Sequence, residues 1–138
     1  MAVIERSFTA SIDVVPDMVG FVAAQAEEAG LHPKRVMHLE VATEEAVVNI
    51  CHYAYKIPPG EVRIRITSEG TAIQVEFIDS GVPFDPLDTP APDLQADLES
   101  RNLGGLGIFL IRRFLDEVHY SRQDGYNILR LVIKNEGA

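Results

Sequence analysis

The order of helical and strand-like apolar patterns limits the folds open to this chain. One alternating stretch, Ser7 to Val15, precedes two helical stretches, and two pairs of alternating stretches follow later. Strands and helices therefore do not take turns along the chain, which disfavours a Rossmann-type parallel sheet. The pattern predicts an α+β fold, a two-layer sandwich in which three helices cover one face of a mostly antiparallel sheet. The length of 138 residues fits a single domain over 1–138.

Two long helices are predicted from their apolar spacing and their first residues. Proline suits the first turn of a helix, so Pro16 and Pro33 mark the two starts. The second helix is expected to run to about Tyr55, with an apolar stripe that faces the sheet. This stripe consists of Val36, Leu39, Thr43, Val47, Ile50 and Ala54. A third, shorter helix is predicted over 108–115.

Two hairpins are predicted to complete the sheet. Residues 62–78 form the first, with its turn at Glu69-Gly70, and 117–134 form the second, with its turn at Asp124-Gly125. Between them lies 79–107, an irregular segment rich in proline. Irregular segments of this length inside a compact domain often serve as lids or binding loops.

Charge and composition exclude several classes of protein. The formal net charge is −9, and a strongly acidic surface disfavours binding to a nucleic-acid backbone. The single cysteine, Cys51, excludes an intramolecular disulfide and a zinc site built on paired cysteines. Residues 1–10 lack a signal-peptide pattern, and no apolar run approaches the ~18 residues that span a bilayer. These features predict a cytoplasmic protein that binds neither nucleic acid nor membranes.

Glu45 and Asn49, four residues apart, are neighbours on one face of the second predicted helix. The amide oxygen of Asn49 suits Mg²⁺, a hard ion that prefers oxygen ligands. The carboxylate of Glu45 can accept a proton from a hydroxyl or a water that attacks a γ-phosphate. Both side chains lie opposite the apolar stripe, together with His38 and His52, so a solvated helix face is the alternative interpretation.

Asp79 ends an apolar strand and is followed by Ser80 and Gly81. Its carboxylate can accept a hydrogen bond from the exocyclic amine of adenine, and Gly81 allows the backbone to approach the edge of the ring. An ordinary turn that closes a strand is the alternative interpretation.

A glycine cluster leads into the third predicted helix. Closely spaced glycines at a helix start form an anion site, because backbone N–H groups point outward and the helix dipole favours phosphate. The cluster comprises Gly104, Gly105 and Gly107, with Leu106 between them and Ile108 after them. Its spacing is not that of a P-loop, and a glycine cluster alone does not specify a nucleotide.

The order of these motifs is more specific than any one of them. Glu-x-x-x-Asn, Asp-x-Gly, a proline-rich lid and Gly-Gly-x-Gly, in this order, resemble the GHKL ATPase/kinase superfamily, which has the Bergerat (histidine-kinase-type) ATP-binding fold. Within it, the chain most resembles the anti-sigma-factor serine kinases, over essentially its whole length. The motifs that carry the resemblance are Glu45-Ala46, Asn49, Ala54-Tyr55, Asp79-Ser80-Gly81, Phe84-Asp85-Pro86, Gly104 to Ile111 and Asp116-Glu117-Val118.

The resemblance implies that the chain binds ATP and Mg²⁺. It implies that Asn49 holds the metal, that Glu45 is the catalytic base for a serine hydroxyl, and that Asp79 reads adenine with Gly81 beside it. Arg101 is the candidate for a γ-phosphate contact, and a solvated arginine is its alternative. The residues implied to line the phosphates are Gly104, Gly105, Leu106, Gly107 and Ile108.

The sequence departs from the family pattern at two places. Pro83 stands where the second motif often carries a further glycine, which makes that turn stiffer. In the last hairpin some relatives place a threonine after the glycine to support adenine, whereas Tyr126 and Asn127 follow Gly125 here. Asn127 is the candidate substitute for that contact.

The resemblance also implies protein partners. A sigma factor would be bound and held inactive, and an anti-anti-sigma (antagonist) protein would be phosphorylated on serine. A homodimer is implied too, and Phe8, Met18 and Phe21 are candidates for an exposed apolar patch at its interface. The alternative function is a non-catalytic regulatory domain of the same fold, in which ATP orders the lid for partner binding.

Overall fold

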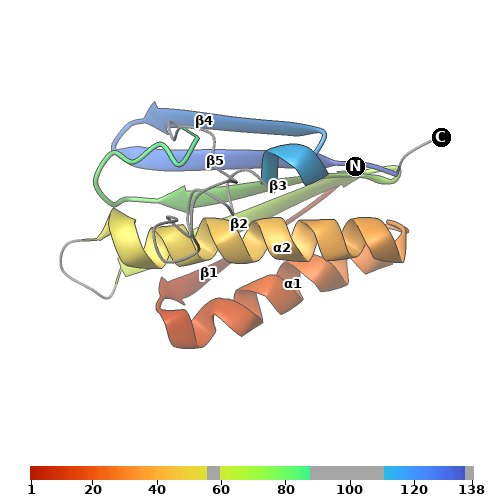
Figure 1. Ribbon diagram of the computed structural model, residues 1–138, viewed down its shortest axis with the longest axis horizontal. Coiled ribbons are helices and arrows are strands. Elements are labelled where there is room, and N and C mark those ends of the chain that lie inside the picture. Colours follow the sequence, from red (N-terminus) through yellow and green to blue (C-terminus); the bar gives the residue numbers. More distant parts are fainter. Residues whose placement is uncertain (56–59, 88–110, 136–138) are drawn as a thin grey trace, which may run out of the picture.

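The computed structural model describes residues 1–55, 60–87 and 111–135 of the chain. Figure 1 shows two layers, a sheet and the helices that cover one of its faces. The sheet has the order β1-β2-β3-β5-β4, and each neighbouring pair is antiparallel. Its strands are β1 (Ala2–Ala10), β2 (Gly60–Glu69), β3 (Ala72–Asp79), β4 (Glu117–Gln123) and β5 (Tyr126–Ile133). The predicted α+β two-layer sandwich is therefore confirmed.

The first strand was predicted over 7–15, and this range is wrong. β1 pairs with β2 from Ala2 opposite Ser68 to Ala10 opposite Gly60, and Ile12–Val14 form a 3₁₀ turn, η1. The strand lies at the sheet edge, where Ala2 to Ser7 are exposed. Because no face of this part is buried, it carries no apolar alternation from which pairing could be predicted.

Two helices form most of the second layer: α1 (Val15–Glu28) and α2 (Pro33–Asn49). Each has proline in its first turn, as predicted. The second helix does not stay α-helical to Tyr55, because Ile50–Ala54 widen into a π-helical turn, η2. The predicted apolar stripe is confirmed, since all six of its side chains are buried against the sheet. A helical turn at 111–114 also lies within the predicted third helix.

Arg35, in the first turn of α2, fixes this helical turn beside α2. Its guanidinium is buried and donates hydrogen bonds to the carbonyl of Phe114 at 2.8 Å and to the carbonyl of Lys134 at 3.0 Å. It also pairs with the carboxylate of Asp116 at 2.8 Å. The start of α2, the start of β4 and the end of β5 are thereby held together.

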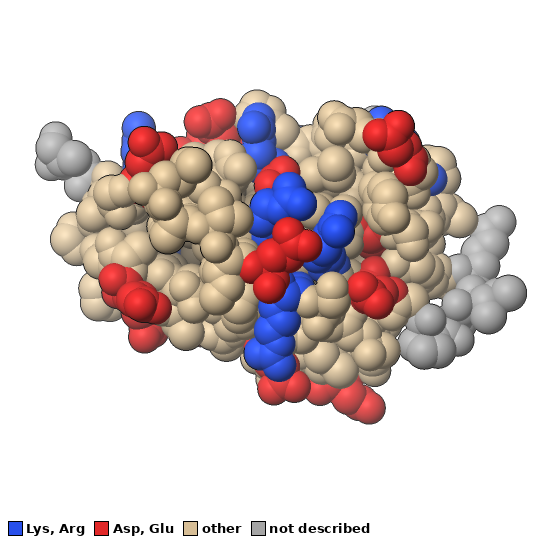
Figure 2. Space-filling view, turned by 180° about the vertical axis from the view of Figure 1, so that it is seen from behind, with Lys and Arg blue, Asp and Glu red and all other residues tan. Residues whose placement is uncertain are grey.

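The other face of the sheet carries a mixed-charge stripe, seen in Figure 2 as alternating red and blue side chains across the middle of the molecule. Glu5 of β1 contacts both Arg63 and Arg65 of β2, at 3.3 and 2.9 Å. Arg65 in turn lies 3.6 Å from Glu76 of β3. Exposed pairs of this kind contribute little stability. The hydrophobic core lies between the sheet and the helices, on the opposite face of the sheet.

The predicted apolar patch for a dimer interface is wrong in its main residues. Phe8 is 6 % exposed and Met18 is fully buried. Phe21 is half-buried, with its ring 5.7 Å from that of Phe8. Phe8 and Met18 are therefore not available to a partner, whereas Phe21 stays partly exposed. In the described ranges, no helix is both long enough and apolar enough to pass through a membrane.

Candidate functional site

Asn49 ends α2, and its side chain is buried at 6 % exposure. Its amide group donates a hydrogen bond to Glu45 at 3.2 Å, which leaves the amide oxygen as an acceptor. Burial raises the pKa of Glu45, a hydrogen bond from Asn49 opposes this, and the neighbouring charge of Glu44 adds to it. The contact between Glu45 and Asn49 follows from their spacing, and the burial of Asn49 excludes a fully solvated face.

Asp79 ends β3 and is 4 % exposed. Its Oδ1 atom accepts hydrogen bonds from the backbone N–H of Gly81 at 3.0 Å and from the side-chain amide of Asn127 at 2.9 Å. Burial raises the pKa of Asp79, whereas Asn127, the Gly81 N–H and the charge of Arg122 lower it. Within the part of the chain that the structure describes, no donor contacts Oδ2, so this atom is left to accept a hydrogen bond from a ligand.

The turn after Asp79 packs directly on the π-helical turn that follows Asn49. The backbone N–H of Val82 donates to the carbonyl of Ala54 at 2.7 Å. The backbone N–H of Ser80 donates to the hydroxyl of Tyr55 at 3.1 Å. These contacts join the end of β3 to the end of the α2–η2 helix, so the fold brings Asn49 and Asp79 to one place. π-Helical turns are rare, and they frequently occur at functional sites.

Gly81 is required for this close approach, and replacing it by Ala is expected to destabilise the fold. A Cβ atom at Gly81 would lie 2.1 Å from the carbonyl oxygen of Ala54. Since the neighbour is backbone, the turn must shift, at a cost of about 1–3 kcal/mol in the free energy of unfolding. Urea-induced unfolding followed by circular dichroism measures this loss.

Gly20→Ala is the matched control for this substitution. Gly20 lies inside α1, and a Cβ there meets nothing within 4 Å. Alanine favours the helix interior over glycine, so this variant should gain about 0.5–1 kcal/mol. Equal stability of Gly81→Ala and the wild type would contradict the packing of the turn on Ala54.

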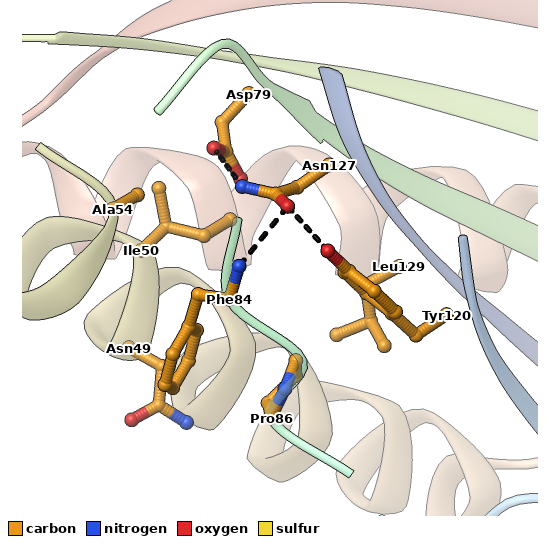
Figure 3. Close-up of a pocket in the computed structure, with 9 residues that line it drawn as sticks. All are labelled: Asn49, Ile50, Ala54, Asp79, Phe84, Pro86, Tyr120, Asn127 and Leu129. Atoms are coloured by element: carbon orange, nitrogen blue, oxygen red, sulfur yellow. Dashed lines mark hydrogen bonds between the residues drawn. The ribbon is translucent and has the colours of Figure 1, made fainter. Parts of the chain in front are cut away.

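Asn49 and Asp79 line one pocket between the end of α2 and the sheet (Figure 3). Its wall is otherwise mostly apolar, and the side chains that form it are Asn49, Ile50, Ala54, Asp79, Phe84, Pro86, Tyr120, Asn127 and Leu129. The cavity has a volume of about 20 Å³, enough for a water molecule. A purine base is larger than this cavity, so residues around it must move to admit one.

The structure places some predicted site residues and leaves others outside its described ranges. Glu45, Asn49, Asp79 and Gly81 lie together at the pocket or in direct contact with a residue of its wall. The expectations for Arg101, Gly104, Gly105, Leu106, Gly107 and Ile108 lie outside the described residues.

Tyr120 belongs to the pocket and was missed in the sequence. Its hydroxyl donates to the amide oxygen of Asn127 at 2.5 Å. Asn127 in turn donates to Asp79, so Tyr120 is linked to Asp79 through Asn127. The signal that could have found it is the alternation of side chains along the strand. Tyr120 lies opposite Leu129 and therefore on the buried face of the sheet. A tyrosine on the core face needs a partner for its hydroxyl, and Asn127 is polar and two residues before Leu129.

The metal-binding capacity of the site rests on Asn49. Among the described residues, no group of three or more His, Cys, Asp or Glu side chains could hold a metal ion. Among the described residues no donor contacts the amide oxygen of Asn49. An amide oxygen is the kind of hard ligand that Mg²⁺ uses when most of its other ligands are waters and nucleotide phosphates. The residues present therefore fit a Mg²⁺ that arrives with a nucleotide.

The chain is similar to known proteins over most of its length. Residues 8–133 match the family model of the histidine kinase-like ATPase domain. The serine-protein kinase RsbW of Listeria monocytogenes serovar 1/2a is 27 % identical over 146 aligned positions, which cover 99 % of this chain and 92 % of the relative. The serine/threonine-protein kinase BtrW of Bordetella bronchiseptica is 29 % identical over 95 positions, which cover 68 % of this chain and 67 % of the relative.

Solved structures show the same fold. The chain superposes on the RsbU and RsbW domains of a Mycobacterium tuberculosis protein with a TM-score of 0.67 and 14 % identity, over 97 % of this chain and 32 % of that one. It superposes on a histidine kinase domain from Erythrobacter litoralis with a TM-score of 0.52 and 16 % identity, over 87 % of this chain and 60 % of that one. With a family model matched from the first strand to the last, the chain belongs to the histidine kinase-like ATPase domain family.

Proposed function

We propose that this protein is an ATP-dependent protein-serine kinase that acts as an anti-sigma factor. The observation that carries the proposal is the contact between Glu45 and Asn49 at the rim of a pocket whose far wall holds Asp79. Phosphoryl transfer from a bound adenine nucleotide needs a catalytic base, a ligand for the metal and an acceptor for the adenine amino group. Glu45, Asn49 and Asp79 would fill these roles in that order. The names of the relatives, serine-protein kinases, support the same activity.

The nucleotide would lie across the pocket, with its adenine ring against Asp79 and its phosphates toward Asn49. Asp79 Oδ2 would accept the hydrogen bond from the 6-amino group of adenine, because Oδ1 already has two donors. The amide oxygen of Asn49 would hold Mg²⁺, which neutralises phosphate charge when bound. For the phosphates we propose Arg101 and the glycine segment 104–108.

Glu45 would act on the protein substrate. A serine hydroxyl attacks the γ-phosphorus, the bond from that phosphorus to the β–γ bridging oxygen breaks, and ADP leaves. The proton of the hydroxyl passes to the carboxylate of Glu45, whose raised pKa suits it to accept that proton. Catalysis in this class rests mainly on positioning and charge neutralisation, and the hydrogen bond from Asn49 holds Glu45 in place.

The partners follow from the resemblance of the motifs to anti-sigma-factor kinases. We propose that the protein holds a sigma factor inactive, that it phosphorylates an antagonist protein on serine, and that it works as a homodimer in the cytoplasm. The burial of Phe8 and Met18 excludes these two side chains from the interface of the dimer.

A second candidate function is a regulator that binds ATP without transferring phosphate. It uses the same pocket, with Asp79 and Asn49 as the groups that bind the nucleotide, and it does not need Glu45 as a base. Phosphorylation of an antagonist protein distinguishes the two functions.

Binding of ATP with and without Mg²⁺ tests the site, and replacing Asn49 by Ala should remove most of the effect of the metal. In wild type we expect Mg²⁺ to tighten ATP binding. In Asn49→Ala the loss of one ligand should weaken binding of Mg²⁺-ATP by about 10-fold or more, which is roughly 1.4 kcal/mol. Titration calorimetry measures both.

The matched control is Glu44→Ala, five residues before Asn49 in α2 and exposed, and it should bind Mg²⁺-ATP like wild type. A folded wild type that does not bind ATP would contradict the proposed function. Equal metal dependence in wild type and Asn49→Ala would remove Asn49 from the site.

A further inference from the structure

Asn127 of β5 lies at the centre of a buried hydrogen-bond network in the wall of the pocket (Figure 3). Its side chain is 4 % exposed. The amide nitrogen donates to Asp79 Oδ1 at 2.9 Å and to the carbonyl of Val82 at 2.8 Å. The amide oxygen accepts from the hydroxyl of Tyr120 at 2.5 Å and from the backbone N–H of Phe84 at 3.3 Å.

These partners allow only one orientation of the amide. The carbonyl of Val82 and the ionised carboxylate of Asp79 can only accept, and the backbone N–H of Phe84 can only donate. Turning the amide over would bring its oxygen against two acceptors and its nitrogen against a donor. Both N–H groups of Asn127 are therefore already used, which leaves neither for a direct contact with a base.

The network determines which oxygen of Asp79 is open to a ligand. Asp79 Oδ1 receives two hydrogen bonds, one from Asn127 and one from the backbone of Gly81. Among the described residues Oδ2 receives none. The carboxylate is thus presented with Oδ1 bound to two donors and Oδ2 open, in an orientation fixed jointly by Asn127 and the backbone of Gly81.

We propose that Asn127, held by Tyr120, is a positioning residue that sets the base specificity of the site. By fixing Asp79 it makes Oδ2 an acceptor for a 6-amino purine and unfavourable for a 6-oxo purine. The inference rests on the proposed function, because it assumes that a purine nucleotide occupies this pocket. It replaces the expectation that Asn127 touches adenine itself.

Two ligands that differ only in the amino group test this role. ATP carries the 6-amino group, and purine riboside 5′-triphosphate lacks it. Asn127→Ser removes the donor to Asp79, and we expect it to weaken ATP binding by about 10-fold, the effect of one hydrogen bond to a charged group. Binding of purine riboside triphosphate, which makes no contact to Oδ2, should change less than about 2-fold.

Tyr120→Phe is a second variant that keeps the ring and removes only the hydrogen bond to Asn127. It should show a smaller loss for ATP, about 3-fold, and again no loss for the analogue, and it carries the test if Asn127→Ser does not fold. Ser121→Ala is the control, because Ser121 is the next residue in β4 and lies on the other face of the strand. It should bind both ligands like wild type.

An independent measurement needs no nucleotide. The hydrogen bond from Asn127 lowers the pKa of Asp79, so a carboxyl NMR titration should find that pKa higher in Asn127→Ser than in wild type.

The outcomes separate this inference from the proposed function. Equal losses for both ligands would mean that Asn127 only supports the fold, and the inference would be overturned while ATP binding stands. A wild type that binds neither ligand would overturn the proposed function, and the inference with it. A loss confined to ATP in both variants supports both.

Discussion

Replacing Glu45 by Gln is expected to reduce phosphoryl transfer by roughly 100- to 10,000-fold, the usual contribution of a general base. Glutamine has the same shape and keeps a side-chain oxygen that can accept the hydrogen bond from Asn49. Binding of Mg²⁺-ATP should therefore stay within about 2-fold of wild type. The measurement is the rate of transfer of labelled γ-phosphate to the cognate antagonist protein at saturating ATP.

The dependence of this rate on pH provides a second measurement. Only the ionised carboxylate accepts a proton, so transfer should rise as the pH rises through the pKa of Glu45. Because burial raises that pKa, the midpoint should lie above the ordinary pKa of glutamate. The residual activity of Glu45→Gln should lack this rise.

Glu44→Gln is the control for charge, since Glu44 neighbours Glu45 and is exposed. Removing its charge should leave the rate close to wild type and should slightly lower the pKa of Glu45, which the Glu44 charge raises. A Glu45→Gln protein with wild-type transfer would exclude Glu45 as the base. Loss of ATP binding in that variant would assign Glu45 to the nucleotide site.

The parts of the fold that could be predicted from the sequence are those in which one face is buried. The stripe from Val36 to Ala54 packs at helical spacing, so the pattern itself carries the information. The turn at Asp124-Gly125 was also predicted, and both residues have positive φ, 52° and 86°, as a type I′ turn requires. The exposed half of β1 has no such pattern, which explains why its start was placed five residues late.

The candidate site was predicted only in its local motifs. Glu45 and Asn49 meet because they are one helical turn apart. The contact of Tyr120 with Asn127 joins two strands, and the contact of Asn127 with Asp79 joins residues 48 positions apart. Such contacts depend on strand register, which is set by the pairing of β3, β5 and β4 and by no short motif. The π-helical turn after Asn49 likewise has no signature in the residues that form it.

Replacing Asp79 by Asn is expected to weaken ATP binding by at least about 100-fold. The asparagine oxygen can keep the hydrogen bonds that Oδ1 accepts from Gly81 and Asn127. Its NH₂ group then takes the place of Oδ2 and faces the 6-amino group of adenine, donor against donor. A lost charged hydrogen bond costs about 1.5–3 kcal/mol and an unpaired buried donor about 1–3 kcal/mol more. Together they cost about 2.5–6 kcal/mol, and 100-fold represents ~2.7 kcal/mol.

The same substitution should not destabilise the protein at pH 7. Burial raises the pKa of Asp79 in the folded state, so the folded protein binds a proton there more readily than the unfolded chain. The contribution of Asp79 to stability is therefore greatest below the ordinary pKa of aspartate and is lost as the pH rises through the raised pKa. At neutral pH the buried charge opposes folding, and removing it in Asp79→Asn should keep or raise the melting temperature.

Loss of ATP binding without loss of stability in Asp79→Asn would show that the carboxylate binds the ligand and does not merely close the turn. Asp85→Asn is the matched control, because Asp85 lies in the same segment and its carboxylate accepts a hydrogen bond from Leu87 at 2.8 Å, outside the pocket wall. It should bind ATP like wild type. Asp79→Asn should also narrow the preference for ATP over GTP, since its NH₂ group can donate to the 6-oxygen of guanine. A marked fall in melting temperature with unchanged affinity for ATP would instead show that Asp79 serves only the turn.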